Sequence, residues 1–428
     1  MAVRFTCHGC GASVDAAAAT PFRCPGSGRP GDEVDHLLVP EDAPAPFGEG
    51  GSPDPYVRYR ALLSPYRLLR AAGLPDQAWL DLAGGLGEAL RRVDGHGFRV
   101  TPLALQPGLA LAAGHAGDLW VKDETGNVSG SHKARHLALV MLYLEVLRAA
   151  RLPAGEGLRA RRLAIASCGN AALAAAVVAR AADWPLDVFV PPDAEAAVVE
   201  RLAALGAQRT VCERRPGEAG DPCYLRFREA VAAGALPFGV QGPDNGLAIE
   251  GGRTLAFELC QGWRDAGAAP DALFVQVGGG ALASAVAQGL RLAVAAGVLP
   301  RAPRLVVVQT EGCAPLERAW RRLGSTPLPE AARHRRRYMW PWEATPHSLA
   351  HGILDDETYD WWAIAEGMRA TGGSAVVVDE GAVARAQGLA RPHAGIAATA
   401  TGTAGLAGLL AAPAPGQGVA VLFTGVER

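Results

Sequence analysis

The chain alternates short hydrophobic runs with small polar turns and longer stretches of helical character. The runs lie at 118–122, 163–166, 187–191, 272–277, 305–309 and 419–423. Runs of this length without polar alternation are typical of strands that are buried on both faces of a sheet. Helical stretches follow three of them, at 137–150, 171–182 and 194–204. Repeated strand-then-helix units predict an α/β fold built on parallel sheets with helices on both faces.

The stretch at 137–150 is apolar all round, which indicates a buried helix. A turn rich in glycine and serine precedes it at 125–131, and Lys133 stands at the first turn of the helix. The positive end of a helix and desolvation both disfavour an ammonium, so we expect a lowered pKa and a reactive amine. Schiff-base chemistry with a carbonyl or with pyridoxal phosphate (PLP) requires such a lysine. Taken alone, the segment would more simply hold a surface lysine.

A second candidate site follows the strand at 272–277, where three glycines stand at 278–280. Consecutive backbone N–H groups without side chains form a cradle for an anion, and a phosphate is its natural guest. The pattern Gly278-x-Gly280-x-x-Ala283 also fits a dinucleotide fingerprint, with Glu311 as the acidic partner. Glu311 lies farther away than the usual spacing of about 20 residues, which favours the cradle for PLP.

Two more polar positions follow buried strands. Residues 167–170, Ser-Cys-Gly-Asn, open the helix at 171–182 and offer free N–H groups to a carboxylate or a ring oxygen. An ordinary turn with Ser167 as the N-cap is the alternative. Thr424 follows the last strand at 419–423. It is a candidate site residue, and an ordinary turn residue is the equal alternative.

These segments resemble the fold-type II PLP enzymes, and threonine synthases in particular. Residues 127–135 read N-V-S-G-S-H-K-A-R, close to the threonine synthase motif N-P-T-G-S-F-K-D-R. The pair His132-Lys133 resembles G-A-H-K of the tryptophan synthase β chain. Further similarity lies in the T-P-L at 101–103, in 167–171 against S-T-G-N-T, in 250–259 against E-G-x-K-T-x-A-F-E-I, in 308–316, and in 346–353 against P-x-T-x-A-x-x-I.

The resemblance implies two open parallel-sheet α/β domains with PLP in the cleft between them. It implies that Lys133 is the catalytic residue, which holds the aldehyde and then removes the α-proton. The implied cofactor contacts are His132, Asn170, Gly278, Gly279, Gly280, Ala281, Leu282 and Thr424. The implied substrate contacts are Ser131, Ser167, Cys168 and Gly169. A threonine hydroxyl at the pyridine nitrogen makes the ring a moderate electron sink, which favours eliminations.

The sequence departs from threonine synthases where those enzymes hold the phosphate of O-phosphohomoserine. The matching anion ligands fall on Gly242, Pro243 and Ala248, and two further threonines are Cys168 and Ala171 here. An unpaired phosphate in a closed site would cost free energy. We therefore expect a β- or γ-elimination or replacement on a different amino acid. Two alternatives stay open: a genuine threonine synthase whose anion is held by Arg135 or by the basic run 333–337, and a non-catalytic or dinucleotide-binding paralogue.

The N-terminal residues 1–46 form a cysteine-bearing module. Cys7 and Cys10 are half of a ribbon-type zinc site and Cys24 belongs to the second half, where Ser27 stands at the position of the fourth ligand. His8 or His36 could substitute, and a decayed ribbon without metal is the alternative. We expect a helical arm at 47–100, with helices at 56–69 and 80–92, and a catalytic core at 101–428 that contains a smaller α/β domain at about 136–240.

Composition narrows the class of protein. The 428 residues are 49% hydrophobic and 20% charged, with a net charge of -2. This balance is typical of a globular enzyme and argues against nucleic acid or membrane as a partner. Eight scattered cysteines and the lack of a signal-peptide pattern predict a reducing, cytoplasmic location. A homodimer is usual in the resembled fold type.

Overall fold

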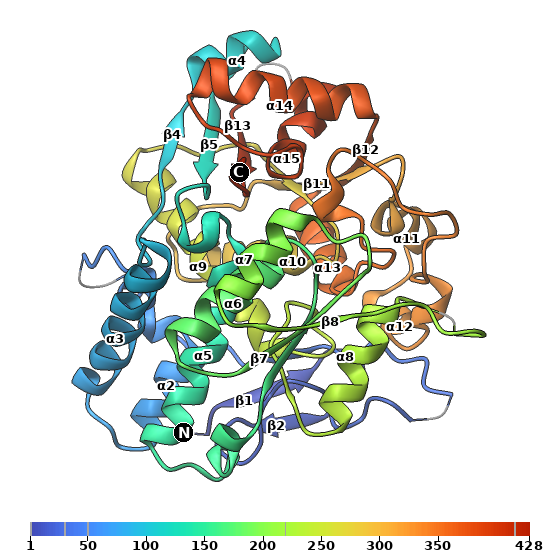
Figure 1. Ribbon diagram of the computed structural model, residues 1–428. Helices are drawn as coiled ribbons and strands as arrows, with labels where there is room; N and C mark the ends of the chain where they lie inside the picture. Colours follow the sequence, from blue (N-terminus) through green and yellow to red (C-terminus); the bar gives the residue numbers. More distant parts are fainter. Residues whose placement is uncertain (1, 30, 49–50, 219, 415–416) are drawn as a thin grey trace.

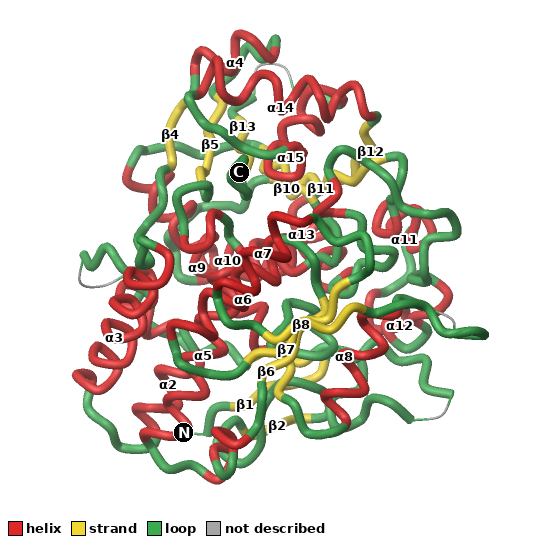
Figure 2. Tube along the Cα trace, viewed as in Figure 1, coloured by secondary structure: helices red, strands yellow, loops and turns green. Residues whose placement is uncertain are grey.

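The computed structural model describes residues 2–29, 31–48, 51–218, 220–414 and 417–428. Three sheets organise these residues: a six-stranded sheet, a four-stranded parallel sheet and a small three-stranded antiparallel sheet. Figure 1 shows the six-stranded sheet in the upper half, the four-stranded sheet in the lower half, and β1 and β2 of the small sheet below it. Figure 2 shows helices around both larger sheets, as the strand-then-helix pattern predicts.

The large sheet has the strand order β12-β11-β10-β13-β5-β4, and only the edge strand β4 runs antiparallel to its neighbour. Its strands are β4 (Leu103–Leu105), β5 (Leu119–Asp123), β10 (Ala272–Gln276), β11 (Arg304–Thr310), β12 (Ser374–Val378) and β13 (Val419–Phe423). Successive residues of the central strands point to opposite faces: Leu273 and Val275 enter one apolar core, while Ala272 and Phe274 enter the other. The sheet is therefore buried on both faces, which explains the unbroken apolar runs.

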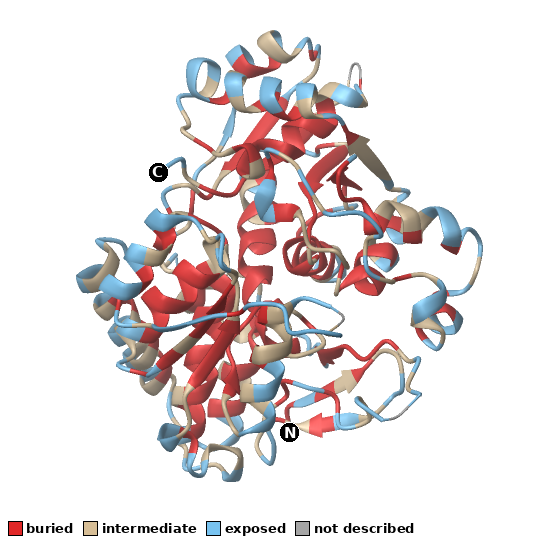
Figure 3. Ribbon diagram, turned by 45° about the vertical axis from the view of Figure 1, so that its right-hand side comes forward, coloured by how far each residue is buried: buried red, intermediate tan, exposed pale blue. Residues whose placement is uncertain are grey.

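Helices cover both faces of the large sheet. The helices that pack on one core are α9 (Gly246–Asp265), α10 (Ala281–Ala295), α11 (Pro315–Leu323), α12 (Leu328–Ala332) and α13 (Trp361–Thr371). Those on the other core are α4 (Pro107–Ala113), α14 (Glu380–Ala394) and α15 (Ala400–Ala411). In Figure 3 the central strands of the large sheet and the inner sides of these helices are buried, and exposed residues lie on the outer surfaces.

The smaller sheet has the order β8-β7-β6-β9 and is parallel throughout. Its strands are β6 (Leu163–Ala166), β7 (Leu186–Val190), β8 (Gln208–Val211) and β9 (Leu236–Pro237). The helices of this smaller domain are α5 (Lys133–Ala149), α6 (Asn170–Ala181), α7 (Ala196–Ala204) and α8 (Pro222–Ala232). Helix α5 is buried over nearly its whole length, because it packs on α6 of this domain and on α9 of the large one. The apolar stretch that follows Lys133 is thus the helix between the two sheets.

The N-terminal module consists of β1 (Arg4–Cys7), β2 (Ser13–Asp15) and β3 (Leu38–Pro40). The helical arm follows, with α1 (Pro55–Arg58), α2 (Ser64–Ala71) and α3 (Asp76–Asp94). The single helix expected at 56–69 is wrong, because Leu63 is extended (φ -97°, ψ 130°). Pro65 has no N–H with which to continue the first helix, but it is tolerated in the first turn of a new one, so α2 begins at Ser64.

The residues of the candidate site follow the carboxyl ends of four strands. Strands β10, β13 and β5 are neighbours and parallel, so the segments after Gln276, Phe423 and Asp123 lie at one edge of the large sheet. The turn after β6, at 167–170, closes the same region from the small domain. Ligands of open α/β sheets bind at such edges. Among the described residues, no helix is both long and apolar enough to cross a membrane.

Candidate active site

Lys133 begins helix α5, and the turn before it has unusual backbone geometry. Ser129 has a positive φ of 56°, and its N–H donates to Asp94 Oδ2 at 2.7 Å. Ser131 then forms a β-bridge with Gly425, which ties the turn to the segment after β13. Burial lowers the pKa of Lys133, and the carboxyls of Asp355 and Asp360 oppose this shift. The lysine is thus half-buried, and two carboxyls act on it electrostatically.

The same two acidic residues contact the triple-glycine turn. The Gly279 N–H donates to Asp355 Oδ2 at 2.7 Å, and the Asp360 N–H donates to Gly279 O at 3.2 Å. A Cβ at Gly278 would lie 2.5 Å from Asp355 Oδ2, and Gly280 has a φ of 99°. Both positions therefore need glycine, for space in one case and for backbone conformation in the other. Lys133 and Gly278 are 145 positions apart in the sequence. The same two aspartates nevertheless act on the lysine and contact the glycine turn.

The glycine turn fits the phosphate of PLP. Its Gly279 N–H already donates to an oxygen from outside the turn, Asp355 Oδ2. Helix α10 begins directly after it, so the N–H groups of Ala281 and Leu282 stand at a positive helix end. No side chain from 278–280 obstructs this place. These residues would hold the phosphate through backbone donors.

Thr424 and Asn170 fit the ring of PLP. Thr424 is buried, and its Oγ1 accepts a hydrogen bond from Gln276 Nε2 at 2.8 Å. Its hydroxyl proton is then available to a ring nitrogen. Asn170 Oδ1 accepts from an Arg428 guanidinium nitrogen at 2.8 Å, which leaves the amide Nδ2 to donate to a ring oxygen. Arg428 also donates to Ser129 O at 2.7 Å, so it bridges the turn before Lys133 to the turn that carries Asn170.

His132 is buried against the segment after β13. Its Nδ1 lies 3.4 Å from Thr424 O, and its Nε2 has no hydrogen-bond partner among the described residues. Burial, together with Lys133, lowers its pKa well below the usual value, so the imidazole is neutral. The observed contact is with Thr424 and not with the glycine turn. The contact of His132 with the phosphate stays a prediction.

The predicted substrate contacts lie on both sides of the cleft. Ser131 is fully buried beside Lys133, whereas Cys168 is exposed at the edge of the small domain. Partial desolvation of the Cys168 thiol raises its pKa, and the charges of Asp193 and Asp355 add to the effect. Asp355 thus acts electrostatically on both Cys168 and Lys133. Ser167 and Gly169 are partly exposed, and the Gly169 N–H lies 3.4 Å from Ser167 Oγ.

Sequence reasoning did not single out four residues that the structure brings to this site, namely Gln276, Asp355, Asp360 and Arg428. The two aspartates belong to the acidic stretch at 355–360, directly after the threonine synthase-like segment at 346–353. That concentration of carboxyls was a signal in the sequence. Gln276 and Arg428 gave none, because one glutamine in a strand and one terminal arginine are ordinary.

Arg135 is not available to a substrate. Its guanidinium donates to Glu124 Oε2 at 2.7 Å and to Glu258 Oε1 at 2.6 Å, and all three side chains have no exposed surface. Lys122 Nζ lies 2.6 Å from Glu258 Oε2. We call Thr101, Lys122, Glu124, Arg135 and Glu258 the closed network. In the basic run, Arg335 is likewise occupied by Asp35 and Glu357. The role of Arg135 as a substrate anion ligand is therefore wrong.

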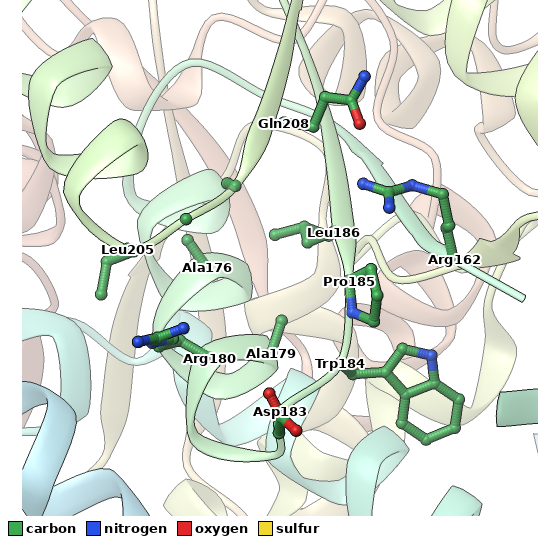
Figure 4. A pocket seen from close by; sticks show the side chains of 12 residues that line it. Arg162, Ala176, Ala179, Arg180, Asp183, Trp184, Pro185, Leu186, Leu205 and Gln208 are labelled. Carbon is green, nitrogen blue, oxygen red and sulfur yellow. The ribbon is translucent and has the colours of Figure 1, made fainter. Parts of the chain in front are cut away.

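A separate surface hollow lies in the small domain. Figure 4 shows Arg162, Arg180, Asp183, Trp184 and Gln208 around it. It opens where β7 and β8 begin, beside the end of α6. Because ligands of such sheets bind at the carboxyl ends of the strands, this hollow is not the candidate site.

Comparisons with known proteins fit this geometry. Residues 96–425 match the pyridoxal-phosphate dependent enzyme family. The "Serine dehydratase-like" protein of Rattus norvegicus is 29% identical over 213 residues, 49% of this chain and 56% of that protein. The chain therefore spans about half the length of the curated relatives it matches.

Solved structures show the same fold. A threonine deaminase from T.th. has a TM-score of 0.58 and 24% identity, covering 81% of this chain and 98% of that one. The diaminopropionate ammonia lyase of Escherichia coli has a TM-score of 0.60 and 17% identity, covering 81% and 89%. The family match spans both sheets and every candidate active-site residue except Arg428. This chain belongs to the pyridoxal-phosphate dependent enzyme family.

Proposed function

We propose that the chain eliminates a leaving group from the β-carbon of a small amino acid and releases ammonia and a 2-oxo acid. This is one member of the broader class of β- or γ-eliminations and replacements expected from the sequence. The observation that carries the proposal is that the charged groups acting on the Lys133 amine are both carboxyls, Asp355 and Asp360. An acidic cleft suits a neutral or cationic leaving group, such as a hydroxyl or an amine.

The acidic wall argues against a phosphorylated substrate. The Gly242 N–H, at the position where a threonine synthase would present a phosphate ligand, lies 3.4 Å from Asp360 Oδ2. Arg135, which could have compensated, is held inside the closed network. Neither Asp360 nor the enclosed Arg135 would balance the charge of a phosphate placed here, at a cost in free energy. This supports a threonine synthase-like enzyme whose substrate is not O-phosphohomoserine.

Each residue has a role in such a reaction. When bound, PLP supplies the electron sink for charge that develops at the α-carbon. The N–H groups at 167–170 would hold the α-carboxylate, and the Lys133 amine would accept the α-proton. Burial raises the pKa of Asp355, against the effects of Lys133 and the Gly279 N–H, so this carboxyl keeps a proton to higher pH. It would give that proton to the departing hydroxyl or amine.

The names of similar proteins point to the same class. They include a serine dehydratase-like protein, a threonine deaminase and a diaminopropionate ammonia lyase. The leaving groups that these names imply carry no phosphate. A cytoplasmic location and a homodimer remain predictions from the sequence.

The test is a substrate comparison with the purified full chain and added PLP. L-serine, L-threonine, 2,3-diaminopropionate and O-phosphohomoserine are supplied separately, and 2-oxo acid, ammonia, threonine and inorganic phosphate are measured. We expect oxo acid and ammonia from at least one of the first three, in equal amounts from L-serine or L-threonine and with two ammonia per oxo acid from 2,3-diaminopropionate, and no phosphate from the fourth. The Lys133→Ala variant is the control for reaction with free PLP.

The competing function is a genuine threonine synthase. It predicts equal amounts of threonine and phosphate from O-phosphohomoserine, at a rate above any release of oxo acid. That result would refute the argument from the acidic wall. Oxo acid from none of the substrates, with PLP bound at Lys133, would refute the elimination of these leaving groups.

A further inference from the structure

Three thiols and one imidazole converge in the N-terminal module, away from the cleft. Cys7 ends β1, Cys10 lies in the turn after it, Cys24 lies in a second turn, and His36 precedes β3. Their ligand atoms all lie within 4.8 Å of one another. Cys7 Sγ is 3.5 Å from His36 Nδ1, and Cys10 Sγ is 3.5 Å from Cys24 Sγ.

These separations are close to those around a tetrahedral zinc ion. Bond lengths of about 2.3 Å for Zn–S and about 2.0–2.1 Å for Zn–N place two sulfurs about 3.8 Å apart and a sulfur and a nitrogen about 3.6 Å apart. Both 3.5 Å contacts are near these values without any rearrangement. A set of four protein ligands leaves no open position, which is the mark of a structural site and not of a catalytic one.

The groups around the four ligands suit a metal as well. His36 Nε2 lies 3.0 Å from Asp32 Oδ2, which fixes the ring and leaves Nδ1 to point at the thiols. A carboxylate behind a ligating histidine is the usual arrangement in zinc sites. The Gly26 N–H lies 3.3 Å from Cys24 Sγ, so it can stabilise a thiolate. A Cβ at Gly26 would be 3.2 Å from Cys10 Sγ and 3.3 Å from His36 Cε1, so glycine gives the ligands their space.

The structure also decides between the candidates for the fourth ligand. The Ser27 hydroxyl donates to Cys24 O at 2.7 Å. The His8 ring lies edge-on against Trp362, with 4.5 Å between ring centroids. His36 alone of these three joins the cluster of thiols in the described part of the chain. The expectation that Ser27 supplies the fourth ligand is therefore wrong.

We propose that Cys7, Cys10, Cys24 and His36 bind one Zn²⁺ ion per chain, with Asp32 orienting His36. The ion joins two turns and the start of β3, which otherwise share only a short antiparallel sheet. Because the unfolded chain cannot present this ligand set, binding stabilises the folded module.

The bound ion has a consequence for the cleft. Leu37, next to His36, lies against Gly242: a Cβ at Gly242 would be 2.5 Å from Leu37 Cδ1 and in contact with Asp360 Oδ1. The Gly246 N–H donates to Phe22 O at 2.9 Å, and the Asp35 N–H donates to Ala332 O at 2.7 Å. The zinc-bound module thus forms the backing of the wall that carries Asp360. Loss of zinc should loosen this wall.

The first experiment measures metal in the full chain. Protein purified without chelators is analysed by plasma mass spectrometry, and then Co²⁺ replaces the native metal. We expect about one zinc per chain, and a Co²⁺ spectrum with intense tetrahedral ligand-field bands and thiolate charge-transfer bands. Protein that holds neither ion after dialysis against equimolar metal would refute the site, as would a Cys10–Cys24 disulfide found in protein kept under reducing conditions. This measurement does not depend on any variant.

The second experiment identifies the ligands. His36→Ala and Cys24→Ser should lose zinc to a chelator at least 10-fold faster than the natural chain and should alter the Co²⁺ bands. Ser27→Ala and His8→Ala are the matched controls from the same module and should keep one zinc. Equal retention in His36→Ala and Ser27→Ala would refute His36 as a ligand. Differential scanning fluorimetry after chelation should show a lower melting temperature in the natural chain but little change in Cys24→Ser.

Discussion

Two groups of charged and polar residues meet at the start of α5, where Lys133 and Arg135 stand two positions apart, and they differ in one respect. In the closed network the positive charges of Lys122 and Arg135 meet the negative charges of Glu124 and Glu258. The second group, which we call the cleft cluster, consists of His132, Lys133, Asp355, Asp360 and Gln276. Three of its atoms have no partner among the described residues: His132 Nε2, Asp360 Oδ1 and Gln276 Oε1.

The difference separates structure from function. Buried polar atoms are almost always paired, so a group of orphans in one place indicates a missing ligand. Burial alone would raise the pKa of Glu258, but Arg135 and Lys122 outweigh it and hold the pKa below its usual value. In the cleft cluster, burial prevails: it lowers the pKa of Lys133 and raises that of Asp360. The closed network fixes α5 in place, while burial in the cleft cluster shifts the pKa values of an amine and a carboxyl toward each other.

The sharpest way to break this comparison is Lys133→Ala. We expect turnover of the best substrate to fall by at least about 10⁴-fold, because the variant loses both the amine that bonds the aldehyde and the base for the α-proton. The absorbance of lysine-bound PLP should vanish, and borohydride should leave no adduct at position 133. Unfolding by urea should change little.

Lys133→Arg separates charge from bonding. It keeps a cation beside Asp355 and Asp360 but cannot form the bond to the aldehyde. It should therefore be as inactive as Lys133→Ala. An active Lys133→Arg enzyme, or a borohydride adduct on another lysine, would show that the cleft cluster has been assigned to the wrong amine.

The closed network makes the opposite prediction. Arg135→Met should lower the free energy of unfolding by about 3–5 kcal/mol, because Glu124 and Glu258 are left buried and unpaired. Arg148→Met is the matched control: its side chain is 61% exposed beside Glu145, so its removal should cost no more than about 1 kcal/mol. Urea midpoints with equal slopes measure both. Equal losses in the two variants would contradict a structural role for the network.

The sequence predicted the fold and much of the site because both follow local rules. Strands such as 419–423 are apolar without interruption, and glycine turns at strand ends mark anion sites whatever their partners. The family match and the solved structures confirm the fold and PLP in place of a dinucleotide, while the roles of the site residues stay predictions. The resemblance to threonine synthases in particular is not confirmed, since motifs shared by the whole family carry little information about substrate.

The sequence alone could not predict which side chains pair when they lie far apart along the chain. Arg135 looked like a free cation until Glu258, 123 residues away, was seen to bind it. Asp355 reaches Gly279 across 76 residues. Spacing put Ser27 at the fourth ligand position with His8 or His36 as substitutes, whereas the fold brings His36 to the three thiols and leaves the Ser27 hydroxyl bonded to Cys24 O.

Asp355→Asn tests the cleft cluster with two substrates, one whose leaving group needs a proton and one whose leaving group does not. If Asp355 protonates the departing hydroxyl, turnover of L-serine should fall about 100-fold, because an amide cannot donate a proton in this way. β-Chloroalanine, whose chloride needs no proton, should lose less than about 5-fold. Initial rates of oxo acid formation measure both. Equal losses on the two substrates would assign Asp355 to positioning and not to proton transfer.

The smallest expected effect is on the pH dependence of stability, tested by Asp360→Asn. Burial raises the pKa of Asp360 well above its ordinary value, Asp35 adds to this, and the Gly242 N–H and Lys133 oppose it. The folded chain therefore binds this proton more tightly than the unfolded chain. The stability that results is fully present below the unfolded pKa of about 3.9 and is lost as pH rises toward the folded pKa.

Removing the carboxyl should remove that loss. The free energy of unfolding of the natural chain, minus that of Asp360→Asn, should therefore fall with rising pH by at most about 1.4 kcal/mol per pH unit. Burial also raises the pKa of Asp35 and Asp54 to about 6. Asp54 is present in both proteins, so its contribution cancels in the difference, whereas Asp35 acts on Asp360 and belongs to the effect that is measured. Urea titrations from pH 4.5 to 8 measure it, with the exposed Asp265→Asn as the control. If the difference stays flat or rises with pH, Asp360 is already ionised and paired in the folded chain. It would then be a paired structural charge, like those of the closed network, and not a member of the cleft cluster.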